Sequence, residues 1–239
     1  WEETSQTNVG FEANVLNNFS VTFDWYKKVT TGILRNPAIP GYIGAISNPA
    51  ANVADMENTG IEFELGYRTR LGDVDFSVNA NASHYTNTVT YLGEVDFYNG
   101  SSFQASSYPI TRVEVGHSYN SFYGFEKLGI FQTQEEVYSH TNSEGAIIQP
   151  DARPGDIIWA DRDDDGDIDA DDRTYLGDPF PSWTYGFTVT AAWKNFDITL
   201  FGQGMTGNTI FQGNAFEIIQ RQIGFHRLAK TLCSPIKIV

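Results

Sequence analysis

Apolar and polar side chains alternate strictly along several segments of the chain, and this alternation constrains the fold more than any other feature. In segment 19–26, the apolar positions on one face are Phe19, Val21, Phe23 and Trp25. The same pattern runs through 11–15, 61–68, 74–83, 185–193 and 196–200. A period of two residues is that of a half-buried β-strand. The chain is therefore expected to be all-β, with antiparallel strands.

The alternating segments are about ten residues long, which suffices for a β-strand to cross a bilayer. Aromatic side chains stand at the ends of the apolar faces: Trp25, Tyr67, Phe76, Tyr185 and Trp193. Short turns near Asn17, Gly72 and Asn195 alternate with long connections at about 31–59 and 93–183. Aromatic girdles, with short turns on one side and long loops on the other, are typical of outer-membrane barrels. The pattern predicts a section of an antiparallel transmembrane β-barrel with long extracellular loops.

A soluble antiparallel sandwich is the alternative fold, because its strands alternate too. The face opposite the apolar one is strongly polar, and it carries Glu62, Glu64, Arg68, Asp75, Asn79 and Asn81. Polar side chains of this kind suit the water-filled interior of a barrel. The polar face therefore favours the barrel over the sandwich.

The densest acidic run, DRDDDGDIDADDR at 161–173, lies inside the second long connection. A calcium loop of the EF-hand type places oxygen ligands at positions 1, 3, 5, 7, 9 and 12, and glycine at 6. Counted from the first aspartate, Gly166 is at position 6, and Ile168, which can anchor the loop, is at position 8. The six ligand positions fall on Asp161, Asp163, Asp165, Asp167, Asp169 and Asp172. Position 7 supplies its backbone carbonyl, and position 12 has aspartate where glutamate is usual.

We expect calcium in this loop, because a hard cation offsets the repulsion between clustered carboxylates. A solvated acidic turn without an ion is the alternative. The upstream segment contains Pro154 and Gly155, and neither flank is helical in character, so a bound ion would be structural rather than part of a sensor. Further upstream, Thr133 and Glu136 form a capping box that predicts a short helix to Ser139.

Composition excludes several classes of protein. The formal net charge of −15 argues against nucleic acid as a partner. The chain has no apolar run long enough for a transmembrane helix. A single cysteine, Cys233, leaves no internal disulfide. The opening WEETSQTNVGFE does not read as a signal peptide, so we expect a mature start or a piece of a longer chain.

Five segments, in this order along the chain, are similar to those of a known family: TNVGFEANVLNNFSVTFDWY, NVADMENTGIEFELGYR, SFYGFEKLGIFQTQEEV, RPGDIIWADRDDDGDIDADDRTYLGDPFPSWTYGF and FDITLFGQGMTGN. Together they resemble the C-terminal half of the SusC-like TonB-dependent outer-membrane transporters of Bacteroidetes. The resemblance implies that residues 1–210 belong to a plugged barrel of about 22 strands. Residues 211–239 would continue the barrel or form an irregular end. The family's D-x-D-x-D-G-x-I motif falls on 161–168, in an extracellular loop.

The resemblance also implies a function and its partners. The whole protein would import nutrients across the outer membrane, with oligosaccharides or peptides as cargo. A SusD-like surface lipoprotein would cover its mouth, TonB would act through an N-terminal part outside this sequence, and lipid would surround the barrel. Within the chain, the loop aromatics would contact cargo: Tyr42, Phe97, Tyr98 and Tyr108.

No enzyme is expected. The stretch 202–207 matches G-x-G-x-x-G, but it follows an alternating strand and has no acid about 20 residues on, as a dinucleotide site requires. Ser118 lacks the glycine pattern of a nucleophile elbow, and Glu62 with Glu64 is better explained as lumen lining than as a glycosidase pair. The histidines show no metal-binding spacing: His84, His117, His140 and His226. The alternative to import is a secreted, calcium-stabilised sandwich module that binds or adheres.

Overall fold

The structure, a computed structural model, describes residues 1–16, 18–36, 49–100, 102–103 and 108–211. Its largest element is an antiparallel sheet with the strand order β1-β2-β3-β4-β11-β12. The strands are β1 (Glu3–Val15), β2 (Phe19–Arg35), β3 (Ala51–Leu71), β4 (Val74–Tyr91), β11 (Trp183–Trp193) and β12 (Phe196–Thr206). The expected all-β antiparallel class is confirmed. The 211–239 segment, apart from Phe211, lies outside the described residues.

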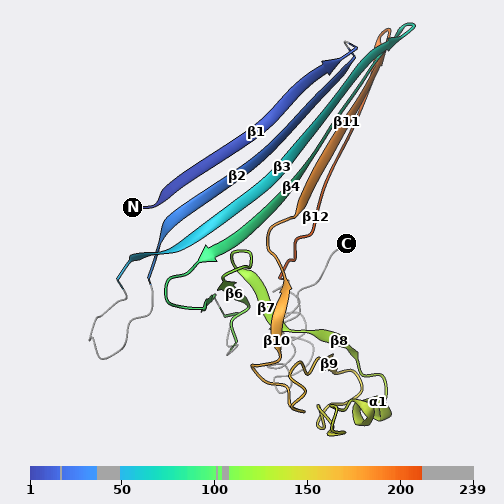
Figure 1. Ribbon diagram of the computed structural model, residues 1–239. Coiled ribbons are helices and arrows are strands. Elements are labelled where there is room, and N and C mark those ends of the chain that lie inside the picture. Colours follow the sequence, from blue (N-terminus) through green and yellow to red (C-terminus); the bar gives the residue numbers. More distant parts are fainter. Residues whose placement is uncertain (17, 37–48, 101, 104–107, 212–239) are drawn as a thin grey trace.

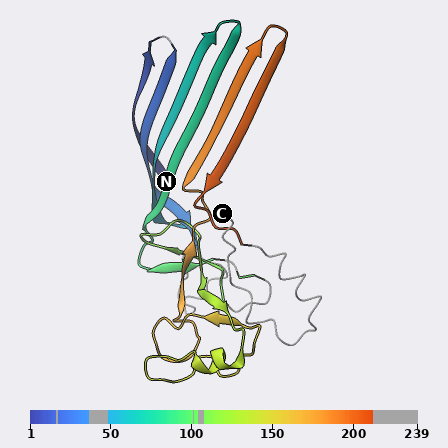
Figure 2. The same cartoon turned by 90° about the vertical axis from the view of Figure 1, so that its right-hand side faces the viewer.

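Smaller elements occupy the long connection between β4 and β11. A second sheet has the order β10-β7-β6-β5 and consists of β5 (Phe97–Asn99), β6 (Thr111–Glu114), β7 (Ser121–Phe125) and β10 (Arg173–Gly177). A third sheet pairs β8 (Lys127–Ile130) with β9 (Ile157–Trp159), and the helix α1 (Gln134–Ser139) lies near it. All of these elements lie beyond one end of the six-stranded sheet (Figures 1 and 2).

The opposite end of the six-stranded sheet carries the short connections of three hairpins: the one between Val15 and Phe19, where Asn17 lies outside the described residues, and two-residue turns at 72–73 and 194–195 (Figures 1 and 2). Gly72 and Lys194 open the two-residue turns with φ angles of 62° and 52°. A positive φ at the first turn position alone is the pattern of type II′ hairpin turns. The three short turns expected from the sequence are thus confirmed, and all lie on the same side.

Strands β2, β3 and β4 are longer than expected, with 17, 21 and 18 residues, whereas β11 and β12 have 11 each. The expectation of a connection at about 31–59 was therefore wrong at both ends, since β2 continues to Arg35 and β3 begins at Ala51. The segment 51–59 shows no alternation of apolar and polar residues, because it lies beyond the part of the sheet where one face is covered with large apolar side chains. Backbone pairing with β2 and β4 continues the strand there, supported by individual side-chain contacts such as the burial of Ala54 in a small core.

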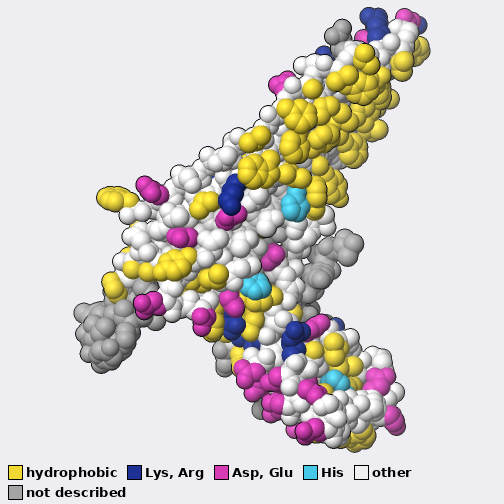
Figure 3. Space-filling model, viewed as in Figure 1, with side chains coloured by type: hydrophobic (Ala, Val, Ile, Leu, Met, Phe, Trp, Pro, Cys, Tyr) yellow, Lys and Arg dark blue, Asp and Glu magenta, His cyan; other side chains and the backbone are white. Residues whose placement is uncertain are grey.

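The two faces of the six-stranded sheet differ sharply in chemistry. One face, here called the apolar face, carries large side chains that remain open to solvent, including Phe11, Ile61, Phe63, Tyr185, Phe187, Ile198 and Leu200. Figure 3 shows hydrophobic side chains gathered over the half of the sheet nearest the turns. Among the described residues no second sheet packs on this face. A sandwich would need such a cover, so the structure favours the barrel section.

Two glycines of the G-x-G-x-x-G stretch have a packing role on the apolar face. Gly202 pairs with Phe187 and Gly204 with Tyr185 across β11 and β12. A Cβ at Gly202 would lie 2.5 Å from the Phe187 ring, and one at Gly204 would lie 2.7 Å from the Tyr185 ring. Aromatic rings that lean over glycines on a neighbouring strand are a known way of covering the exposed backbone. The motif is therefore explained by strand packing.

Where the long strands approach the smaller sheets, they bend and form a small core. The register of β2 against β3 shifts between Thr30 and Ile33, and the N–H of Gly32 donates to the Asp55 carboxylate at 2.8 Å. Beyond this bulge, a core joins the six-stranded sheet to the four-stranded sheet. It consists of Ala54, Val89, Leu92 and Val113, with Ile33, Tyr98 and Tyr119 packed against it. This core fixes the smaller sheet to the end of the larger one.

Candidate functional site

The acidic loop connects β9 to β10, in the part of the molecule farthest from the hairpin turns (Figure 1). Upstream of it stands α1, which Thr133 caps by accepting a hydrogen bond from the N–H of Glu136. The short helix expected from the capping box is confirmed. Around the loop, acidic side chains cover much of the surface in view (Figure 3).

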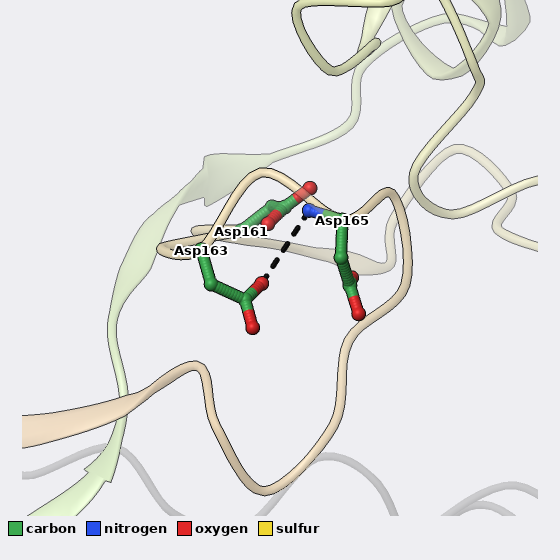
Figure 4. Close-up of side chains that lie close together, drawn as sticks. All are labelled: Asp161, Asp163 and Asp165. Carbon is green, nitrogen blue, oxygen red and sulfur yellow. Dashed lines mark hydrogen bonds between the residues drawn. The ribbon is translucent and has the colours of Figure 1, made fainter.

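Three of the six predicted ligands come together. One carboxylate oxygen from each of Asp161, Asp163 and Asp165 lies within 4.8 Å of the other two (Figure 4). The Asp161 carboxylate accepts hydrogen bonds from the N–H groups of Asp164 at 2.7 Å and Gly166 at 2.9 Å. Gly166 has a φ of 89°, which favours glycine. These contacts wrap the loop tightly around its first carboxylate.

The other three predicted ligands do not belong to this group of carboxylates in the described part of the chain. Asp172, whose side chain is 1% exposed, accepts hydrogen bonds from the N–H of Arg162 at 2.6 Å and of Asp169 at 2.8 Å. Asp169 in turn accepts from Asp171, and the Asp167 carboxylate accepts from the N–H next to it. Position 12 of the loop thus closes the loop onto its own backbone.

Electrostatics differ between neighbouring aspartates of the loop. Although Asp163 lies at the surface, crowding by surrounding atoms raises the pKa of its carboxyl. The N–H of Asp165 lowers this pKa by hydrogen bonding, whereas the negative charges of Asp165, Asp172 and Asp161 raise it. By contrast, hydrogen bonds from Ser143, whose N–H lies 2.8 Å away, lower the pKa of the Asp164 carboxyl. Repulsion is therefore concentrated where the three carboxylates meet.

A turn at 141–147 supports the loop, and sequence reasoning missed this contact. Asn142, buried at 9% exposure, accepts hydrogen bonds from the N–H groups of Glu144 and Ala146. Its amide also donates to the backbone carbonyl of Asp164 at 3.3 Å. An asparagine shortly before a glycine, as in Asn142-Ser143-Glu144-Gly145, is a turn signal that could have revealed it.

The second candidate site is the polar face of the six-stranded sheet. The cross-strand register places Asp24 opposite Glu62, Glu64 opposite Asn81, and Arg68 opposite Ser77. All the polar positions predicted for the lumen share this face: Glu62, Glu64, Arg68, Asp75, Asn79 and Asn81. The sequence therefore assigned the two faces of the sheet correctly.

The loop aromatics proposed to contact cargo serve in packing. Phe97 stacks on the Arg112 guanidinium, 3.9 Å from its ring centroid. Tyr98 packs against the small core, and Tyr108 contacts the Phe125 ring edge-on at 5.5 Å. Phe97 and Tyr108 keep 40% and 37% of their surface exposed, so these two retain a surface for contact. Tyr42 lies outside the described residues.

The histidines make separate contacts. His84 packs against Trp183, His117 stacks on Tyr175 at 3.6 Å, and a ring nitrogen of His140 lies 3.1 Å from the Trp159 carbonyl oxygen. Within the described residues, no histidine joins a group that could hold a metal. His226 lies outside that part of the chain.

Comparison with known proteins places the chain in a family. No family model matches it. TonB-dependent receptor P3 of Formosa agariphila is 30% identical over 223 residues, which cover 91% of this chain and 22% of the relative. TonB-dependent receptor SusC of Bacteroides thetaiotaomicron is 25% identical over 221 residues, covering 88% of this chain and 20% of SusC. The chain belongs to the SusC-like TonB-dependent receptors. The expected resemblance is confirmed, and so is the outer-membrane location.

Solved structures show the same fold. The RagAB peptide transporter superposes with a TM-score of 0.67 at 23% identity, covering 90% of this chain and 22% of the transporter chain. The "open-open" state of the RagAB peptide importer gives 0.67 at 24% identity, covering 88% and 21%. This SusC-like chain therefore spans about a fifth of the length of the proteins it matches. The relatives are named as receptors, in agreement with the expectation of no enzyme. Among the described helices, none has the length and apolar character to span a membrane.

Proposed function

We propose that this chain forms part of the wall and extracellular region of a closed, plugged outer-membrane barrel that imports nutrients in a TonB-dependent manner. The observation that carries the proposal is the six-stranded sheet with an uncovered apolar face, a polar opposite face and tight turns at one end. The apolar face would contact lipid, and the polar face would line the lumen. Membership of the SusC-like receptors supports the same assignment.

The partners follow from the same proposal. A SusD-like surface lipoprotein would meet the receptor on the side of the smaller sheets, and TonB would act through a segment outside this chain. The cargo would be an oligosaccharide or a peptide; RagAB, which shares the fold, is described as a peptide transporter. Neutral polar side chains on the polar face, among them Asn79, Asn81 and Ser83, would hydrogen-bond to either kind of cargo.

Uptake by cells tests the import function. A strain that lacks the receptor gene, a strain with a disrupted tonB gene and the parent strain are each supplied with mixed oligosaccharides and mixed peptides. Disappearance of each compound from the medium is followed by mass spectrometry. Both mutant strains should leave the same compounds behind. Unchanged uptake of every compound by the receptor-deficient strain would contradict the import function.

We further propose that the acidic loop holds a structural calcium ion. The carboxylates of Asp161, Asp163 and Asp165 would supply its oxygen ligands, with the side chains of Asp169 and Asp172 and the backbone carbonyl of Asp167 completing the set. The close approach of three carboxylates and the left-handed backbone at Gly166 support this assignment. The ion would stiffen a loop that has no strand pairing of its own.

The substitution Asp165→Ala tests the calcium site in the purified whole receptor. The melting temperature of the unmodified receptor should rise with calcium and fall with a chelator, whereas the variant should lose this response, because it lacks a ligand. Asp171→Ala is the matched control, since Asp171 is an exposed aspartate of the same loop outside the ligand positions. An identical calcium response in both variants and the unmodified receptor would rule out the site.

A further inference from the structure

A recess opens on the polar face of the sheet, across β1, β2 and β3. It has a volume of about 270 Å³ and is lined by Gln6, Asn8, Asp24, Tyr26 and Glu62, together with Trp25, whose side chain belongs to the apolar face. The lining residues come from three neighbouring strands in consecutive register, so the backbone pairing of the sheet fixes their relative positions.

Two glycines shape this recess. Gly10 lies opposite Asp24, and a Cβ there would be 1.9 Å from a carboxylate oxygen of Asp24. Gly60 lies opposite Tyr26, and a Cβ there would be 2.4 Å from the Tyr26 ring. Without side chains at these positions, the Asp24 carboxylate leans over β1 and the Tyr26 ring leans over β3. The recess is thus a consequence of the sequence on all three strands.

Two carboxylates of the recess stand where sheet energetics disfavour them. Asp24 and Glu62 are direct cross-strand neighbours, and like charges at directly opposite positions destabilise a sheet. Across the described residues, neither forms an ion pair with a lysine or arginine, whereas Glu57 pairs with Lys27 at 2.8 Å. Two more carboxylates, those of Glu12 and Glu64, lie one row nearer the turns on the same face. The polar face of β1, β2 and β3 therefore carries a cluster of negative charge around Asp24 and Glu62 that, in the described part of the chain, no ion pair with these two residues offsets.

We propose that this recess binds an organic cation, an ammonium or a guanidinium group. The two carboxylates would accept its N–H donors, and paired carboxylate contacts to such groups are strong and directional. The Tyr26 ring adds a π face, to which cations are attracted. A shared metal ion fits less well, because no three carboxylates of this face, as far as the structure describes it, converge closely enough to hold one.

A cationic group of this chemistry can come from two sources. It is either a charged group on cargo passing through the lumen, which rests on the proposed import function, or a lysine or arginine from a part of the receptor outside this chain. The test uses the whole receptor purified in detergent, unmodified and with the double substitution Asp24→Asn/Glu62→Gln. These substitutions keep the shape of both side chains and remove both charges.

The probes are N-acetyl-arginine amide and its neutral analogue N-acetyl-citrulline amide, with binding followed by calorimetry at low salt. If cargo supplies the cation, the arginine probe binds the unmodified receptor at least tenfold more tightly than the double variant, and the citrulline probe does not distinguish them. If another part of the receptor supplies the cation, that group already occupies the recess. The arginine probe then does not bind there, and the double variant melts several degrees lower than the unmodified receptor in the absence of any probe.

The control variant is Asp75→Asn/Asp197→Asn. It removes two carboxylates from the same face that both lie next to Ala192, close to the turns. This control should retain probe binding and the original melting temperature. The proposal is overturned if the Asp24/Glu62 variant alters neither probe binding nor melting, or if the control variant reproduces its effects. Unchanged uptake of every compound by the receptor-deficient strain, together with normal probe binding by the purified receptor, would count against import and leave the recess intact.

Discussion

At the scale of single residues, Asn142 organises the region around the acidic loop. Its side chain satisfies the N–H groups of Glu144 and Ala146 and donates to the carbonyl of Asp164. It is 9% exposed, so water does not replace these contacts easily. Leaving buried backbone groups without partners costs about 1–3 kcal/mol. One side chain therefore couples the 141–147 turn to the acidic loop.

Asn142→Ala should loosen this region without unfolding the receptor. We expect faster amide hydrogen exchange across 142–166, by roughly five- to 150-fold for a loss of about 1–3 kcal/mol. Hydrogen exchange with mass spectrometry measures this directly. Glu144→Ala is the control, because this exposed side chain makes no comparable contact. Equal exchange in both variants would contradict the role of Asn142.

The residue pattern predicted the type of loop better than it predicted the contacts of the individual carboxylates. The spacing of the acidic run correctly identified a tight loop with a left-handed glycine at Gly166. It could not reveal that Asp172 turns onto the backbone N–H groups of Arg162 and Asp169, because spacing says nothing about which donor a carboxylate meets. For the same reason, the pairing of Asp24 with Glu62 became evident only with the strand register.

At the scale of elements, the critical feature is the junction between the six-stranded and four-stranded sheets. Leu92 and Val89 are each 2% exposed and pack with Val113 of β6. Just outside this core, Arg35 donates to the hydroxyl of Tyr119 at 2.7 Å. The smaller sheet is thus held by a compact apolar contact rather than by a flexible linker.

Leu92→Ala should weaken this junction by about 2–5 kcal/mol, the usual cost of truncating a buried leucine. We expect the segment 93–131 to become sensitive to protease while the barrel keeps its folded mobility on unheated gels. Leu128→Ala, at a position 59% exposed, is the matched control. Protection of 93–131 equal to that of the control would show that the junction does not depend on this core.

Element prediction succeeded where one face of a strand meets an apolar environment. Alternation located β11, β12 and those parts of β2, β3 and β4 that lie nearest the hairpin turns. It failed for 51–59, because this part of β3 is held by backbone pairing with β2 and β4 and by scattered contacts such as that of Ala54, so its side chains show no regular alternation of apolar and polar residues. The short β8 and β9 likewise carry too few residues for a period to appear.

At the scale of the whole molecule, apolar and acidic surfaces are segregated. Hydrophobic side chains cover the sheet nearest the turns, and acidic side chains gather around the smaller elements at the opposite end (Figure 3). A chain with a formal net charge of −15 can meet lipid only if its charges stay away from that band. In the proposed barrel, this segregation would place the turns on one side of the membrane and the acidic loop on the other.

The most direct test of this account compares two lysines placed one residue apart on β11, in Phe187→Lys and Thr188→Lys. Phe187 lies mid-strand on the apolar face, where a lysine in lipid costs about 2–4 kcal/mol, whereas Thr188 lies on the polar face. The amount of folded receptor in outer membranes is measured by its heat-modifiable gel mobility. We predict a marked loss for Phe187→Lys and near-normal levels for Thr188→Lys. Equal levels of the two variants, or a greater loss for Thr188→Lys, would contradict the assignment of the apolar face to lipid.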